Sequence, residues 1–269
     1  MGVGATSPAD QRLAEVAAAT LQVELLNPCP QACHLEGGSL LLQIHEGIPQ
    51  LRMTGPRAPG PVVVGFEDNA LASRRRAGHN ELLGRAIGWR HSRAPRVLDA
   101  TAGFGRDAFV LADLGCDLLL CERNPVMAFL LEAALCRCRE NGGSWLREVA
   151  SRMSLRGTDA RSLADIELRD REVIYLDPMF SADRKSAPGK EMQLLHLLTA
   201  EETSQRDSPG ELLEWALEQP VQRVVVKRPR RESPLAGVRP GHSLQGRSVR
   251  FDVYPLAPPT AADQDTSQE

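Results

Sequence analysis

The segment at residues 96–107 reads RVLDATAGFGRD and is the most informative part of the chain. Its apolar start predicts a short buried strand over residues 97–99. Glycines at 103 and 105 let the backbone turn sharply and come close to a ligand. A helix expected from residue 106 offers unpaired backbone N–H groups in its first turn. Together these features predict a strand, a ligand-binding loop and a helix in succession.

Beyond this segment, apolar runs continue to alternate with helical patterns. Strands are expected at residues 118–121, 153–156, 173–176 and 223–227, helices at 106–114, 125–138 and 211–217, and an edge strand at 248–254. Strands that alternate with helices form mostly parallel sheets that are covered on both faces. The expected fold class is therefore α/β, with a Rossmann-like, mostly parallel twisted sheet and helices on both of its faces.

The chain is expected to have three parts. Residues 1–70 predict a small β-rich N-terminal unit, with strands at 21–25, 40–44 and 62–65 and with residues 1–10 disordered. Residues 71–257 hold the main domain, which begins with a helical, arginine-rich connector. Residues 258–269 are rich in polar residues, which predicts a disordered tail.

The composition limits the class of protein. The chain of 269 residues is 42% hydrophobic, enough to bury a core, and its net charge is -3. No apolar run reaches the roughly 18 residues that cross a membrane, and the N-terminus lacks the pattern of a secretory signal. Cys29, Cys33 and His34 lack a second pair of ligands at zinc-like spacing, so no metal site is expected. These features predict a cytoplasmic protein.

The charges around the glycine loop limit the classes of ligand that it can bind. Glu122 ends the next expected strand, where its carboxylate can accept hydrogen bonds from two ribose hydroxyls. With Gly103 and Gly105 it also satisfies the pattern of dinucleotide-binding proteins, so an NAD(P)-dependent oxidoreductase is an alternative. Asp99 and Asp107, however, would repel a pyrophosphate. They suit a cationic ligand with an ammonium and a sulfonium, such as S-adenosylmethionine (SAM).

A second motif follows the strand expected at 173–176. It reads Asp177-Pro178-Met179-Phe180 and resembles the Asp/Asn-Pro-Pro-aromatic motif of the amino-methyltransferases. The lone pair of an exocyclic base amine is delocalised into the ring. The Asp177 carboxylate and the Pro178 carbonyl can accept its N–H groups and direct the lone pair toward a methyl donor, while Phe180 stacks on the base. We assign catalysis to Asp177, Pro178 and Phe180.

Several motifs that follow one another in order point to one bacterial family. They are DATAGFGRDAFVL at 99–111, CERNP at 121–125, YLDPMF at 175–180, KSA at 185–187, KEM at 190–192 and VVVKRP at 224–229. This combination resembles the bacterial 16S ribosomal RNA guanine-N2 methyltransferases of the J type, which are class I SAM-dependent enzymes. The resemblance runs from Ala70 to Tyr254. It implies methyl transfer from SAM to the N2 amine of a guanine in ribosomal RNA.

The same resemblance implies which residues bind the cofactor and the RNA. SAM contacts are implied for Arg106, Asp107, Glu122, Arg123, Thr158, Asp159 and Asp177, in addition to Asp99, Gly103 and Gly105 of the glycine loop. RNA phosphates are expected to meet Arg74, Arg75, Arg76, Lys185, Lys227 and Arg228. The expected partner is ribosomal RNA or the small ribosomal subunit, with no membrane and no obligate protein partner.

The residues by themselves leave other functions open. The motif at Asp177 does not separate a base methyltransferase acting on ribosomal RNA from one acting on DNA adenine N6 or on a protein glutamine. The glycine loop also permits an NAD(P)-dependent oxidoreductase. A catalytically inactive RNA-binding subunit is a further alternative, and the intact Asp177 argues against it.

Overall fold

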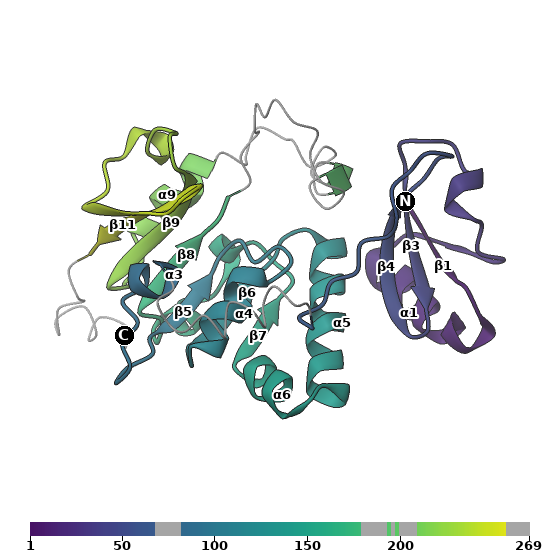
Figure 1. The fold of residues 1–269 in the computed structure, drawn as a ribbon, viewed down its shortest axis with the longest axis horizontal. Coiled ribbons are helices and arrows are strands. Elements are labelled where there is room, and N and C mark those ends of the chain that lie inside the picture. Colours follow the sequence, from purple (N-terminus) through teal and green to yellow (C-terminus); the bar gives the residue numbers. More distant parts are fainter. Residues whose placement is uncertain (68–81, 179–192, 195–196, 199–208, 257–269) are drawn as a thin grey trace, which may run out of the picture. The chain divides into compact units, whose positions relative to one another are not determined.

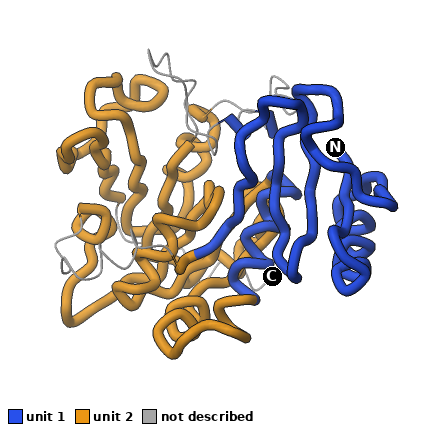
Figure 2. Tube along the Cα trace, turned by 45° about the vertical axis from the view of Figure 1, so that its right-hand side comes forward, with its two compact units in different colours: residues 1–65, 124–136, 181–204 blue, residues 66–123, 137–180, 205–269 orange. Residues whose placement is uncertain are grey.

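The computed structural model describes residues 1–67, 82–178, 193–194, 197–198 and 209–256 (Figure 1). The chain divides into two compact units, which Figure 2 colours separately. Unit 1 consists of residues 1–65, 124–136 and 181–204, and unit 2 of residues 66–123, 137–180 and 205–269. The grouping of two later segments with the N-terminal residues was not indicated by the sequence. No helix in the described ranges is long and apolar enough to span a membrane.

A seven-stranded sheet forms the centre of unit 2. Its strands are β5 (Arg96–Asp99), β6 (Asp117–Cys121), β7 (Met153–Arg156), β8 (Val173–Leu176), β9 (Arg223–Pro229), β10 (His242–Gln245) and β11 (Val249–Pro255). They lie in the order β10-β11-β9-β8-β5-β6-β7. Strands β5 to β9 run parallel, and β11 is antiparallel to both of its neighbours. The order reverses between β5 and β8, so the carboxyl ends of these two strands flank the point where such sheets bind ligands.

Helices cover both faces of this sheet. The helices of unit 2 are α3 (Leu82–Ala86), α4 (Arg106–Asp113), α6 (Ser144–Ser151), α7 (Asp165–Leu168), α9 (Pro209–Leu217) and the 3-10 turns η3 (Ala160–Ser162) and η4 (Leu235–Gly237). The helix α5 (Pro125–Asn141) begins in unit 1 and ends in unit 2. The α4 helix lies on the face that carries Tyr175, since the Tyr175 hydroxyl donates to Asp107 in its first turn. The α9 helix packs on the other face through Leu213 and Ala216. The expected α/β class is confirmed.

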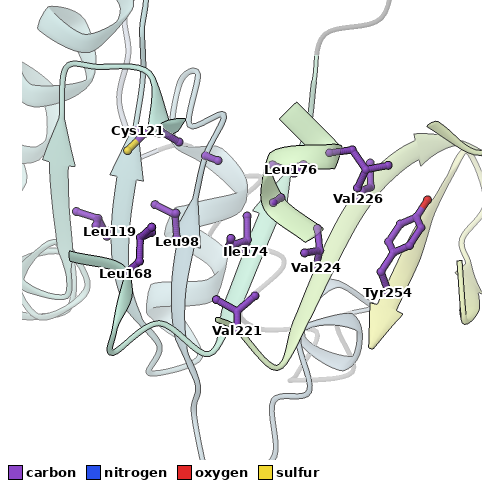
Figure 3. Close-up of a cluster of buried hydrophobic side chains, with 14 of the residues drawn as sticks. Leu98, Leu119, Cys121, Leu168, Ile174, Leu176, Val221, Val224, Val226 and Tyr254 are labelled. Carbon is purple, nitrogen blue, oxygen red and sulfur yellow. The ribbon is translucent and has the colours of Figure 1, made fainter. Parts of the chain in front are cut away.

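Alternating side chains of the strands build the core under α9. Figure 3 shows this cluster running across the sheet from Leu119 on β6 through Leu98 and Ile174 to Val224 on β9 and Tyr254 on β11. All five are almost fully buried. Because both faces of the central strands are covered, their residues form apolar runs rather than alternating with polar ones. That is why these strands could be predicted from the sequence.

Strand β11 corrects one expectation for this sheet. We predicted a strand at 248–254 on the edge, but β11 lies between β9 and β10. The true edge strand, β10, has the sequence His-Ser-Leu-Gln and pairs antiparallel with β11. Its polar composition gives no strand signal, so the sequence pattern points to its neighbour as the edge.

Unit 1 contains a separate four-stranded sheet. Its elements are β1 (Gly2–Ala5), η1 (Pro8–Asp10), α1 (Gln11–Leu21), β2 (Glu24–Leu26), η2 (Ala32–His34), β3 (Leu40–His45) and β4 (Ile48–Met53). The strand order is β2-β1-β3-β4, with β1 parallel to β2 and β3. The strand expected at 40–44 is confirmed as β3. The strand expected at 62–65 is reduced to a single bridge between Leu51 and Val62.

The first residues of unit 1 contradict the predicted disorder at 1–10. Strand β1 lies inside the sheet, and Val3 is completely buried. The side chain of Asp10 is also buried and accepts hydrogen bonds from Ser7 and from the backbone of Gly47. A four-residue strand with two glycines has low strand propensity, and only its pairing with β2 and β3 stabilises it.

Candidate active site

The glycine loop joins β5 to α4 and is tied to the end of β6. Gly103 and Gly105 have positive φ angles of 55° and 70°. Residues other than glycine adopt such angles only at a cost in conformational energy. The N–H of Gly103 donates to Glu122 Oε2 at 2.8 Å, and the N–H of Ala102 donates to the carbonyl of Cys121 at 2.9 Å. Glu122, only 8% exposed, thus holds the loop in shape as well as ending β6.

Asp99 is a buried carboxyl group at the end of β5. It is 2% exposed and accepts a hydrogen bond from the N–H of Thr101 at 3.0 Å. Burial is the largest of the effects that together raise the pKa of Asp99 to about 8; the Thr101 N–H opposes it, and the carboxylates of Asp107, Asp177 and Glu122 add to it. At neutral pH this carboxyl group is therefore largely protonated. A cation bound beside it would favour the ionised form.

An ion-paired cluster lies at the switch point. Lys227 Nζ donates to Asp107 Oδ2 at 2.7 Å and to Asp177 Oδ2 at 2.8 Å. The hydroxyl of Tyr175 also donates to Asp107 Oδ2, at 2.8 Å. The backbone N–H of Asp177 donates to Thr101 Oγ1 at 2.6 Å, which links the end of β8 to the loop after β5. The chain therefore brings Asp107, Asp177 and Lys227 together from three distant segments.

Charges in this cluster set the protonation of Asp177. Burial raises the pKa of Asp177, whereas Lys227 lowers it and Asp107 raises it. Burial also lowers the pKa of Lys227, but Asp107 and Asp177 outweigh that effect and raise it above its usual value. Lys227 is thus a permanent cation that favours the ionised form of Asp177 while fixing one of its oxygens in place.

The donors and acceptors of the site fit SAM. The carboxyl groups of Asp99, Asp107, Glu122 and Asp177 gather at the ends of β5, β6 and β8 and at the start of α4, and Lys227 offsets only part of their charge. A ligand that carries an ammonium and a sulfonium suits such a surplus of acid. The carboxylate at the end of β6 suits ribose hydroxyls. We therefore regard these four acidic residues and the two glycines as the groups that would hold SAM.

The remaining predicted cofactor residues are exposed or partly exposed. Arg106 and Arg123 are exposed. Thr158 hydrogen-bonds to Ser162 at 2.7 Å. The Asp159 carboxylate accepts two hydrogen bonds from the side chain of Arg161, which lowers its pKa. A contact of Asp159 with SAM would therefore compete with this local pair.

Some of the predicted site residues lie outside the described part of the chain, and others are buried in the protein. Phe180, Arg74, Arg75, Arg76 and Lys185 lie outside the described residues. Pro178 is buried next to Asp177. Arg228 is 7% exposed and donates to the carbonyl of Ser233 while pairing with Glu232, so its guanidinium is used inside the protein.

Two residues of the site were not predicted from the sequence, and a third has contacts that were not predicted. Thr101 and Tyr175 were not singled out, although both lie inside the recognised motifs. Lys227 was expected to meet RNA phosphates, but it lies between two carboxylates of the site. The available signal was its place at the end of the strand beside β8, where parallel strands deliver their side chains to the same edge.

The strand order and this acidic site define a SAM-dependent methyltransferase. A family model described as "Putative SAM-dependent methyltransferase" matches residues 31–256. The chain is 40% identical over 255 residues to ribosomal RNA small subunit methyltransferase J of Pseudomonas fluorescens (strain Pf0-1), covering 89% of this chain and 96% of that protein. It is 43% identical over 212 residues to the protein of the same name from Coxiella burnetii (strain RSA 493 / Nine Mile phase I), covering 78% and 80% of the two chains.

A solved structure agrees with these sequence matches. The crystal structure of a SAM-dependent methyltransferase from Neisseria gonorrhoeae superimposes with a TM-score of 0.72 at 29% identity, and the match covers 100% of both chains. The chain belongs to this SAM-dependent methyltransferase family, and within it to the group of relatives named ribosomal RNA small subunit methyltransferase J. The enzyme uses SAM, and the alternative of a dinucleotide-dependent oxidoreductase is set aside.

Proposed function

We propose that this enzyme transfers the methyl group of SAM to the exocyclic N2 amine of a guanine in 16S ribosomal RNA. The observation that carries the proposal is the placement of Asp177. Asp177 directly follows β8 at the switch point, its backbone N–H donates to Thr101 Oγ1 of the loop after β5, and its carboxylate accepts from Lys227. The printed names of the relatives support ribosomal RNA as the substrate.

The residues of the site explain how an unreactive amine can be methylated. Bound SAM supplies an electrophilic methyl group. Asp177 and the carbonyl of Pro178 accept the N–H groups of the guanine amine, which localises the nitrogen lone pair. Lys227 favours the ionised form of Asp177 and restrains its orientation through a 2.8 Å contact. Positioning of this kind provides much of the rate in such reactions. Phe180 stacks on the guanine ring in this proposal.

The setting follows from the substrate. A ribosomal RNA methyltransferase acts in the cytoplasm on RNA or on the small subunit, so we propose that location. Arg74, Arg75, Arg76 and Lys185 stay in the proposal as RNA contacts. Lys227 and Arg228 leave that set, because their charges are paired within the protein.

The direct test is methylation of ribosomal RNA by the purified enzyme. Small subunits from a bacterial strain that lacks the corresponding enzyme are incubated with labelled SAM, and the modified base is mapped. We expect one labelled N2-methylguanine in 16S RNA. Label in DNA adenine or in a protein glutamine instead would contradict the proposal and support one of the other amine substrates.

A variant of Asp177 provides the matched control. Asp177→Ala removes the carboxylate that accepts the amine hydrogens, so we expect the turnover rate to fall by at least about a hundredfold. The affinity for SAM, measured by calorimetry, should fall much less, because the glycine loop and Glu122 are retained. Wild-type turnover in this variant would refute the assigned role.

A further inference from the structure

A buried arginine holds a surface turn next to the active site. Arg250 on β11 is 7% exposed and pairs with Asp252 through both of that carboxylate's oxygens, at 2.8 and 2.9 Å. Its remaining nitrogen, Nη1, donates to the carbonyls of Pro229, Arg230 and Glu232. Three carbonyls of one turn therefore converge on a single buried cation, which fixes the shape of the turn after β9.

The same turn has a second internal anchor. Arg228 donates to the carbonyl of Ser233 at 2.8 Å and pairs with Glu232 at 3.1 Å. Glu232 is the acidic residue of this turn, so its charge is directed toward Arg228. The N–H of Arg230 donates to the carbonyl of Ser248, which joins the turn to the loop between β10 and β11.

The turn after β9 and the loop joined to it present positive charge to the solvent. Arg230 and Arg231 in the turn and Arg247 in the joined loop are all exposed. No ion pair is recorded for them among the described residues. We call these three residues the arginine platform. Two buried arginines, Arg228 and Arg250, fix the shape of the turn below the platform, because they bind its backbone carbonyls.

The platform lies at the edge of the sheet that holds the active site. Strands β8 and β9 are parallel, with Leu176 opposite Val226, so Asp177, which follows β8, and Lys227, within β9, lie at the same level. The platform begins three residues beyond Lys227, at the carboxyl end of β9. A nucleic-acid strand whose base reaches Asp177 would therefore carry its neighbouring phosphates toward this edge.

We propose that the arginine platform of Arg230, Arg231 and Arg247 binds the phosphate backbone of the RNA substrate beside the target base. The identity of the RNA rests on the proposed function, whereas the pairing of arginine with phosphate applies to any nucleic acid. Guanidinium groups pair with phosphate oxygens through two parallel hydrogen bonds. Such contacts position a nucleic acid without reading its sequence.

The test compares RNA binding by the wild type and by the variant Arg230→Ala/Arg231→Ala/Arg247→Ala. Fluorescence anisotropy with a labelled RNA hairpin is measured over a range of salt concentrations. We expect the variant to bind roughly tenfold more weakly, and the slope of log K against log salt to fall by about one for each arginine removed. SAM affinity should stay the same. Replacing all three residues by lysine should retain most of the salt dependence.

Arg239 supplies a matched control. It is exposed, and it precedes β10 at the opposite end of the β10–β11 hairpin from Arg247. Arg239→Ala should leave RNA affinity and its salt dependence unchanged. Equal RNA binding by the wild type and the triple variant would overturn the inference, as would absence of RNA binding by the wild type or a parallel loss of SAM affinity in the variant. If the wild type binds RNA through these arginines but methylates none, the platform stands and the proposed function fails.

Discussion

At the residue scale, the chemistry depends on a carboxylate that is partly buried and ion-paired. Burial raises the pKa of Asp177, and Lys227 opposes that effect at a distance of 2.8 Å. The same lysine neutralises Asp107, which would otherwise repel Asp177. Lys227 therefore acts as a positioning residue, whose influence on the reaction passes through Asp177.

Replacement of Lys227 should shift the pH dependence of catalysis. The ionised carboxylate of Asp177 accepts the amine hydrogens much more strongly than its protonated form would, and Lys227→Met removes the cation that lowers its pKa. The pKa then rises, so activity should be lost at a higher pH on acidification, by about one to three pH units. Profiles of kcat against pH measure this shift. Lys227→Arg keeps the charge and should stay close to the wild type. An unchanged profile in the methionine variant would contradict the positioning role.

At the element scale, the C-terminal strands depend on an internal ion pair. Asp252 on β11 is 1% exposed, and Arg250 is the cation that pairs with it. Arg250 also accounts for three of the hydrogen bonds to the turn after β9. Removal of one partner of a buried pair leaves an uncompensated charge inside the protein.

Arg250→Ala should therefore destabilise the protein strongly. We expect the free energy of unfolding to fall by about 3–5 kcal/mol, which urea denaturation can measure. The exposed Arg239→Ala should change it by no more than about 0.5 kcal/mol. Similar stabilities for the two variants would show that the pair contributes little.

The elements also show what the sequence can and cannot reveal. The parallel strands of unit 2 were predictable because burial on both faces leaves short apolar runs such as Val173–Leu176. Strands β1 and β10 were missed because their residues carry no such signal and are stabilised by neighbouring strands. The glycine loop and Asp177 were recognised from local motifs. The role of Lys227 was not, because only the folded sheet brings residues 107, 177 and 227 together.

At the scale of the whole molecule, binding of the cofactor should be coupled to protons. Burial and the neighbouring carboxylates raise the pKa of Asp99 to about 8, so this carboxyl group is mostly protonated at pH 7. A cation bound beside it favours the ionised form, and the proton must then leave. We expect SAM binding at pH 7 to release a fraction of a proton, seen by calorimetry in buffers of different ionisation enthalpy. The same binding enthalpy in every buffer would rule out this coupling.

The position of β1 has a practical consequence. Residues Gly2–Ala5 join β2 to β3, so these two strands have no direct pairing of their own in the sheet order. Trimming even a handful of amino acids from this end would split the sheet into two pieces, although such trimming is often harmless elsewhere.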